Sequence, residues 1–264
     1  MIMIGLGAGR TGTASLANLI DSQANALCFH ELNPCCAVFA GNGQFALNTI
    51  SEFQRIVDNG PRNLLTVDMS RPISVKKYAD LQQRDRIDLI GDIAYYYLSY
   101  VPELIALNAD VRFVCIKRDK NETVASWLAK SKIHRWRSLW LADRFKSLLT
   151  RIPFHESYNF WQEHDGSRYA PNPVWDSTFP KFDGPTKKEA IEQYWDFYYA
   201  KAQRYAEQYQ DFFRIFDIGA LSHRDGQAAI LRFLGIPDNE MVLKDAYHLH
   251  RLASNKPPSA TDSA

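Results

Sequence analysis

Short apolar runs alternate along the chain with longer stretches whose apolar residues recur at helical spacing. The apolar runs predict buried strands at residues 1–6, 25–32, 64–69, 87–93, 111–116 and 212–218. The helically spaced stretches predict helices at residues 13–20, 41–59, 101–107, 117–130 (after an initial turn), 187–210 and 227–234. Alternating strands and helices are typical of an α/β fold with a central, mainly parallel sheet. We therefore predict a layered α/β domain with helices flanking the sheet.

Residues at the ends of these segments support several of the helices. Pro102 suits the first turn of a helix. Asn121 is a candidate cap for the helix that follows the 111–116 strand. Gly235 and Pro237 are expected to end the last helix.

Residues 151–186 interrupt the alternation. They are rich in proline, glycine and aromatic residues and show no periodicity. A loop of this length is usually functional or disordered, and its aromatic content argues against disorder. We expect an ordered lid or wall of a substrate site, with a structural insertion as the alternative. It would belong to a single domain over residues 1–255, followed by a disordered tail at 256–264.

Composition narrows the functional classes. The 264 residues carry a formal net charge of +1, whereas nucleic-acid-binding proteins usually have a clear basic excess. The four cysteines follow no scaffold spacing, which favours a reduced, cytoplasmic setting. The first apolar run is too short for a signal peptide, and no stretch approaches the roughly 20 apolar residues of a membrane span. We expect no nucleic-acid partner and no transmembrane segment, and the sequence leaves the oligomeric state open.

A glycine-rich turn between the first strand and the first helix is a candidate phosphate site. Residues 7–12 fit the G-x-G-x-x-G dinucleotide fingerprint, and Glu31 lies about where a ribose-binding acid is expected. The same residues fit the frame of a Walker-type loop, but Thr13 and Ala14 replace its lysine and hydroxyl residue. Because both templates need a tight turn, the glycines alone do not decide between them.

A second candidate anion site follows the 111–116 strand. Lys117 and Arg118 stand at its carboxyl end, and Asn121, Thr123 and Ser126 enter the next helix. Ligands of open α/β sheets bind at the carboxyl ends of strands, and a helix N-terminus favours an anion. An arginine there can hold a phosphate through two hydrogen bonds. An ordinary capped helix with solvated charges is the alternative.

Several segments together resemble sulfotransferases that use 3′-phosphoadenosine 5′-phosphosulfate (PAPS). They are GRTGTAS at 9–15, IGDIAYYYLSYVPELIALNADVRF at 90–113, VRFVCIKRDKNETVASW at 111–127 and FFRIFDIGALSHRDGQAAILRFLGIP at 212–237. They cover roughly half of the chain and are scattered along it. The resemblance implies a P-loop-like three-layer α/β fold and transfer of a sulfuryl group to a hydroxyl or amine, leaving 3′,5′-adenosine bisphosphate (PAP).

The resemblance also implies roles for individual residues. Arg10 would neutralise the leaving phosphate, and Arg118 and Ser126 would hold the 3′-phosphate. The expected cofactor-binding set is Gly9, Arg10, Thr11, Gly12, Thr13, Ala14, Ser15, Arg118, Ser126, Asn255 and Lys256.

The chain departs from the family pattern at three places. Ala14 replaces a hydroxyl residue, although its backbone amide remains. Ile93 follows Asp92 where many relatives have a lysine. The closing loop near the C-terminus is matched only weakly, by residues 254–256.

An acceptor hydroxyl also needs a general base. The family often places His or Glu just after the second strand, where this chain has His30 and Glu31. Neighbouring strand residues point to opposite faces, so we expect one of the two to face the site. We favour His30, whose ordinary pKa is near the working pH, with Glu31 and Asp92 as alternatives. A structural role for His30 also remains open.

No metal is expected. The pair Cys28 and His30 with residues 35–36 matches no zinc spacing, and a structural role is expected for the histidines at 248 and 250. The aromatic residues of 151–186 suit a sugar, a phenol or a lipid face, so we expect a small-molecule or glycan acceptor of undetermined identity.

Two alternatives from other classes remain. An NAD(P)-dependent oxidoreductase of the Rossmann type would explain the fingerprint and Glu31 but gives Arg118 and Ser126 no role. A non-catalytic nucleotide-binding module of sulfotransferase fold would explain Ala14 and the missing lysine after Asp92. A P-loop kinase is less consistent, because the Walker lysine and hydroxyl residue are absent.

Overall fold

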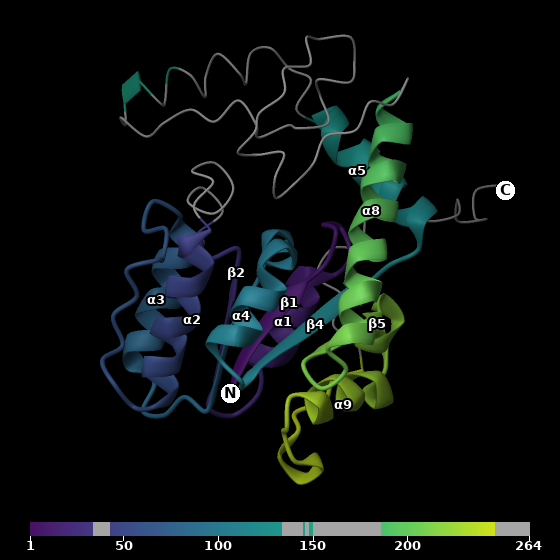
Figure 1. The fold of residues 1–264 in the computed structure, drawn as a ribbon. Coiled ribbons are helices and arrows are strands. Elements are labelled where there is room, and N and C mark those ends of the chain that lie inside the picture. The colour runs from purple at the N-terminus through teal and green to yellow at the C-terminus, as the bar shows by residue number, and fades with distance from the viewer. Residues whose placement is uncertain (34–42, 134–144, 146–147, 150–185, 246–264) are drawn as a thin grey trace, which may run out of the picture.

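The structure, a computed structural model, describes residues 1–33, 43–133, 145, 148–149 and 186–245. Its centre is a five-stranded sheet with the order β2-β3-β1-β4-β5, in which all neighbouring strands are parallel. The strands are β1 (Ile2–Leu6), β2 (Ala26–His30), β3 (Leu89–Ile93), β4 (Val111–Lys117) and β5 (Phe213–Asp217). Their carboxyl ends therefore meet at one edge of the sheet, at the top of Figure 1.

Helices cover both faces of this sheet. One face packs against α1 (Thr13–Asp21) and α9 (Arg224–Phe233), and the other against α2 (Gln44–Val57), α4 (Val101–Leu107) and α8 (Lys187–Gln208). The α5 helix (Lys120–Ile133) packs on α8, and α3 (Pro72–Gln83) contacts the edge strand β2 (Figure 1). Two 3₁₀ segments, η2 (Tyr95–Tyr100) and η4 (Ile218–Ser222), directly follow β3 and β5, and a third, η5 (Asp238–Glu240), comes after α9.

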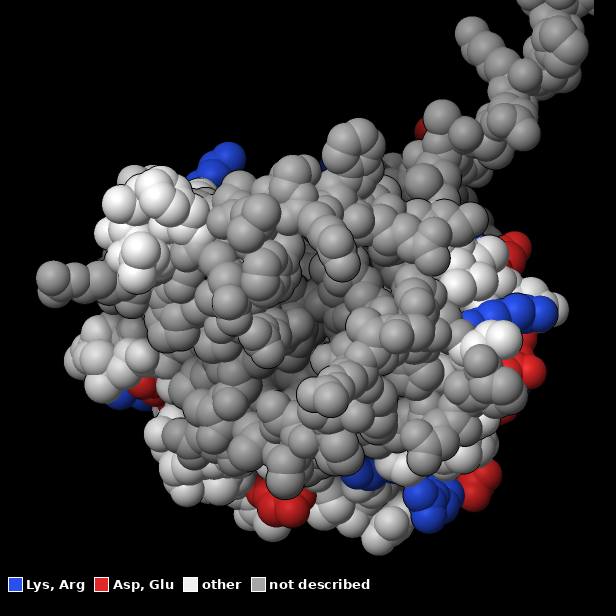
Figure 2. Space-filling view, turned by 90° about the horizontal axis from the view of Figure 1, so that it is seen from above, with Lys and Arg blue, Asp and Glu red and all other residues white. Residues whose placement is uncertain are grey.

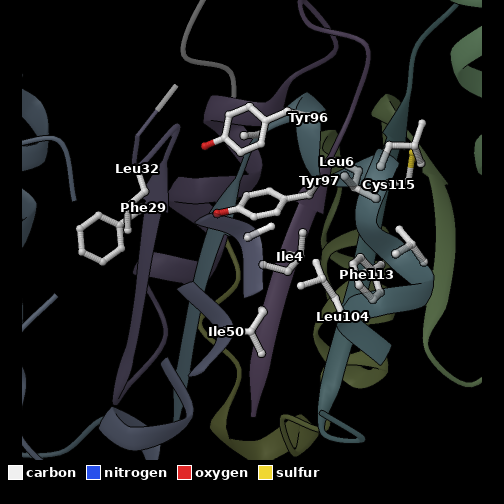
Figure 3. Close-up of a cluster of buried hydrophobic side chains, with 14 of the residues drawn as sticks. Ile4, Leu6, Phe29, Leu32, Ile50, Tyr96, Tyr97, Leu104, Phe113 and Cys115 are labelled. Carbon is white, nitrogen blue, oxygen red and sulfur yellow. The ribbon is translucent and has the colours of Figure 1, made fainter. Parts of the chain in front are cut away.

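The two faces of β1 supply two hydrophobic cores. Ile4 and Leu6 point into the cluster under α2, α4 and α8, whereas Met3 belongs to the cluster under α1 and α9. Phe113 of β4 and Tyr97 join the first cluster (Figure 3). Burial on both faces explains why the strands read as continuous apolar runs. Seen from above (Figure 2), the charged side chains on the described part of the surface are of both signs, as the near-neutral composition implies.

The predicted fold class is confirmed: three layers around a parallel sheet. One predicted strand, 64–69, is wrong. Two of its backbone donors, the amides of Leu65 and Thr66, bond to the buried Glu52 carboxylate at 3.0 and 3.2 Å. With those amides bonded to a side chain, the segment has no need of a neighbouring strand.

Helix ends mostly follow the predicted boundaries. Pro102 lies in the first turn of α4, and Gly235 adopts a left-handed φ of 72° just after α9. The predicted cap Asn121 is wrong, because α5 begins one residue earlier and Asp119 accepts the Glu122 amide at 3.0 Å. The α3 helix was not predicted from the sequence pattern.

The strand order differs from that of the dinucleotide-binding fold. In the Rossmann order 3-2-1-4-5-6, strand 2 lies beside strand 1. Here β3 lies between β1 and β2. Neighbouring strands are about 4.8 Å apart, so the end of β2 is displaced by one strand from its place in a Rossmann sheet.

Other predictions fall largely outside the described residues. They include most of the 151–186 insertion and the 256–264 tail, so the extent of the 1–255 domain stays a prediction. Among the helices that the structure describes, we find none with the length and apolar character to cross a membrane.

Candidate functional site

A cavity of about 260 Å³ lies at the carboxyl edge of the sheet, between the ends of β1, β2 and β4. It gathers residues that are far apart in the sequence, from both candidate phosphate sites and from the end of β2. Its lining residues are Gly9, Arg10, Gly12, Thr13, Ala14, Ser15, His30, Glu31, Tyr95, Arg118, Ser126, Trp127 and Ile218.

The loop between β1 and α1 is built from left-handed backbone. Gly9, Arg10 and Gly12 have φ values of 77°, 59° and 87°. A side chain on Gly9 would place its Cβ 2.5 Å from the Trp127 ring, so only glycine fits there without displacement. The loop therefore passes close to α5, whose first turns belong to the second candidate phosphate site.

The start of α1 leaves backbone donors available. Its N-cap is Gly12, which has no side chain to accept a hydrogen bond from the amides of the first turn. Thr13, Ala14 and Ser15 of that turn all line the cavity. The helix dipole and these amides together favour an anion at this position. The missing hydroxyl of Ala14 leaves this backbone arrangement intact.

Two arginines from the two motifs meet at the cavity. Arg10 Nε donates a hydrogen bond to Ser126 Oγ at 3.0 Å, and Arg118 Nη1 donates to the Arg10 carbonyl at 3.1 Å. Burial and the neighbouring positive charge of Arg118 lower the pKa of Arg10. Arg118 is balanced in part by Glu122, at 2.9 Å on the outer side of α5. An anion in the cavity would relieve the repulsion between the guanidinium groups.

His30 and Glu31 both line the cavity. The expectation that only one faces it is wrong, because β2 ends at His30 and Glu31 adopts a left-handed φ of 54° beyond the strand. His30 Nε2 lies 3.1 Å from the hydroxyl of Thr13, in the first turn of α1. Glu31 is held by Arg71, whose guanidinium lies 3.7 Å from its carboxylate and also donates to its backbone carbonyl.

Asp92 is placed differently from our expectation. It is fully buried and does not line the cavity. Its carboxylate accepts hydrogen bonds from the amides of Leu32 and Ile93 at 3.1 and 2.9 Å and from the Tyr97 hydroxyl at 2.8 Å. Burial raises its pKa to about 6, although these hydrogen bonds oppose the rise. With its oxygens so occupied, Asp92 is a structural group, and we remove it from the candidate bases.

Three other residues of the expected set are not among the described residues that line the cavity. Thr11 is fully buried within the loop and does not line the cavity. Asn255 and Lys256 lie outside the described residues. The cavity is also lined by three residues outside the expected set: Tyr95, Trp127 and Ile218. Tyr95 and Ile218 lie within two residues of the ends of β3 and β5, so the rule that ligands bind at strand carboxyl ends could have found them.

Possible metal ligands do not gather at one place in the described part of the chain. Within the described part of the chain, no three histidine, cysteine or acidic side chains are grouped as a metal site would require. Cys28 and Cys115 are free and buried, and burial raises the pKa of both thiols. Residues 35–36, 248 and 250 lie outside the described ranges.

Comparisons with known proteins find similarity to solved structures. No protein-family model and no curated protein matches the sequence. The chain is similar to a sulfotransferase from Alicyclobacillus acidocaldarius, with a TM-score of 0.45 and 11% sequence identity over 97% of this chain and 86% of that one. A likeness this distant does not establish an activity, so function is inferred from the residues of the cavity.

Proposed function

We propose that the protein is a sulfotransferase that binds PAPS in the cavity at the carboxyl edge of the sheet. One observation carries the proposal: the Arg118 guanidinium donates a hydrogen bond to the Arg10 carbonyl, 108 positions away in the sequence, in the cavity that the N-terminus of α1 also lines. PAPS carries one phosphate on the 3′ position and one on the 5′ position of its ribose, so it needs two such anion sites side by side. The glycine loop alone would be compatible with many nucleotides.

The residues of the cavity suit the binding of PAPS. The amides of Thr13, Ala14 and Ser15 would hold the 5′-phosphosulfate, with Arg10 beside them. Arg118 and Ser126 would hold the 3′-phosphate. Because Arg10 is bonded to Ser126, it also joins the two halves of the site.

The proposed chemistry is sulfuryl transfer to a hydroxyl or amine of a small molecule or glycan. PAPS would supply an activated sulfuryl group with a nucleotide bisphosphate as the leaving group. Arg10 would stabilise the negative charge that develops on the leaving phosphate, in a partly desolvated setting where such charges interact strongly. His30 would accept the proton of the attacking group, with Glu31 as the alternative base.

A thermal-shift panel on the full chain tests cofactor choice. A ligand at about 100 times its dissociation constant adds about 2.7 kcal/mol to the free energy of unfolding. We expect PAP to raise the melting temperature, and NAD, NADP and ATP to raise it much less. A shift with NAD and none with PAP would refute the proposal and restore the oxidoreductase alternative.

A separate assay distinguishes an enzyme from a binding module. Transfer of radiolabel from ³⁵S-labelled PAPS to sugars, phenols and amines would support catalysis. PAP binding without transfer to any of these acceptors would favour the non-catalytic module.

A further inference from the structure

Helix α8 reaches the cavity loops from outside both sequence motifs. The Tyr198 hydroxyl accepts a hydrogen bond from the Gly7 amide at 3.0 Å and donates to the Tyr95 carbonyl at 3.3 Å. It therefore ties the loop after β1 to the segment after β3. Tyr198 is buried and burial raises its pKa, so its hydroxyl stays protonated at neutral pH and can serve as both donor and acceptor.

The next residue makes an equivalent connection toward β4. The Tyr199 hydroxyl accepts from the Ala8 amide at 3.5 Å and donates to the Ile116 carbonyl at 2.8 Å. One turn earlier on α8, the Trp195 indole donates to the Arg118 carbonyl at 3.2 Å. Three side chains of one helix face thus bond to backbone atoms of both candidate phosphate loops.

These contacts act on the backbone of both loops, in addition to the direct bonds from Arg118 to the Arg10 carbonyl and from the Trp127 indole to the Ala8 carbonyl. The amides of Gly7 and Ala8 belong to a glycine-rich loop with left-handed residues, which has little intrinsic rigidity. The Arg118 carbonyl lies at the end of β4, immediately before the turn into α5. Lys117 lies 5.2 Å from the Trp195 ring and 5.7 Å from the Tyr199 ring, so the end of β4 also rests on this helix face through cation–π contacts.

We propose that Tyr198, Tyr199 and Trp195 set the spacing between the two phosphate-binding halves of the cavity and so select nucleotides that bridge both halves. This inference rests on the proposed function. The three are positioning residues, because they hold the backbone of the loops and do not line the cavity. Loss of one of their hydrogen bonds would leave each half able to hold a phosphate, but the separation of the halves would be fixed only by the direct bonds from Arg10 to Ser126 and from Arg118 to Arg10.

The test compares a bridging ligand with a non-bridging one on the full chain. Dissociation constants for PAP and adenosine 5′-phosphate are measured by calorimetry for wild type, Tyr198→Phe, Tyr199→Phe and Trp195→Phe. We expect each variant to lower the preference for PAP by about tenfold, the equivalent of one lost hydrogen bond. Tyr205→Phe, on the same helix but away from both loops, is the matched control and should keep the wild-type preference.

Two outcomes separate positioning from simple stabilisation. A purely structural role would weaken both ligands equally and leave their ratio unchanged, which would overturn the inference. Amide hydrogen exchange gives a readout that needs no ligand: Gly7 and Ala8 should exchange faster in Tyr198→Phe and Tyr199→Phe, and unchanged exchange would also overturn it. If wild type binds PAP no better than adenosine 5′-phosphate, the proposed function fails. If wild type prefers PAP and all three variants keep that preference, only the positioning role fails.

Discussion

Asp92 is a buried carboxylate whose structural role follows from its hydrogen-bond partners. It lies in strand β3, next to β2, and accepts a hydrogen bond from the Leu32 amide, which anchors the segment that follows His30. A buried carboxylate is expensive unless its oxygens are hydrogen-bonded, and here backbone amides and the Tyr97 hydroxyl supply the bonds. The residue thus supports the cavity from below.

The raised pKa of Asp92 predicts a pH-dependent stability. Because its pKa is about 6 in the folded protein against 3.8 ordinarily, the folded state binds an extra proton between about pH 4 and 6. The contribution of Asp92 to the free energy of unfolding therefore falls as the pH rises through this window. Asp92→Asn keeps an oxygen for the two amides and removes the charge, so it should be more stable than wild type at pH 8, by up to about 3 kcal/mol, and near wild type at about pH 3.5, below the ordinary pKa of 3.8.

Urea unfolding at the two pH values measures this difference. Asp211→Asn, at an exposed position, is the control and should show the same stability relative to wild type at both. A stability difference for Asp92→Asn that does not change with pH would contradict the assignment.

His30 allows a prediction about turnover. His30→Gln should lower the rate of sulfuryl transfer from labelled PAPS about a hundredfold or more, because a positioned general base contributes about that factor. It should leave the affinity for PAP nearly unchanged. His223→Gln is a suitable control, since His223 caps α9 through its Nδ1 and lies outside the cavity. Full turnover in His30→Gln would transfer the role to Glu31 or to another group.

At the scale of single elements, the close approach between the first loop and α5 predicts how much stability is lost when Gly9 gains a side chain. Gly9 and Gly235 both have left-handed φ, but only at Gly9 would a Cβ meet a neighbouring ring, 2.5 Å away on Trp127. Gly235→Ala should lose about 1 kcal/mol of unfolding free energy to the backbone conformation. Gly9→Ala should lose about 1–3 kcal/mol more through overpacking. Chemical denaturation of the two variants checks this, and equal losses would mean that the loop does not pack against Trp127.

Some element boundaries were readable from the sequence and others were not. Five of the six apolar runs are strands of the sheet, because strands buried on both faces must be apolar throughout. The sixth run, 64–69, failed because Glu52, one turn before the end of α2, competes for its backbone donors. No local pattern reveals such a long-range bond. By contrast, the predicted start of the 187–210 helix agrees with α8, and the capping box of Thr186 with Glu189 at that position is a local signal.

At the scale of the whole molecule, the strand order decides which residues share the cavity. Two motifs more than a hundred residues apart meet because β1 and β4 are neighbours in the sheet. The sequence predicted that both lie at strand ends, and the resemblance named Arg10, Arg118 and Ser126. The bond from Arg10 to Ser126 and the tethers from α8 depend on how the elements pack, which local patterns do not encode.

The strand order also bears on the competing functions. With β3 between β1 and β2, the sheet does not have the Rossmann arrangement that a dinucleotide fingerprint followed by a ribose-binding acid presupposes. Glu31 lines the cavity but is held by Arg71. The molecule as a whole therefore favours a nucleotide held by two anion sites over an extended dinucleotide.

The central claim is that the two arginine-bearing loops form one bisphosphate site, and calorimetric titration of PAP and adenosine 5′-phosphate tests it most directly. Wild type should prefer PAP by about tenfold or more, because a hydrogen bond to a charged group is worth about 1.5–3 kcal/mol. Arg118→Ala should lose this preference. Arg112→Ala, on the same strand but at its opposite end, should keep it. Equal binding of the two nucleotides by wild type, or an undiminished preference in Arg118→Ala, would contradict the account.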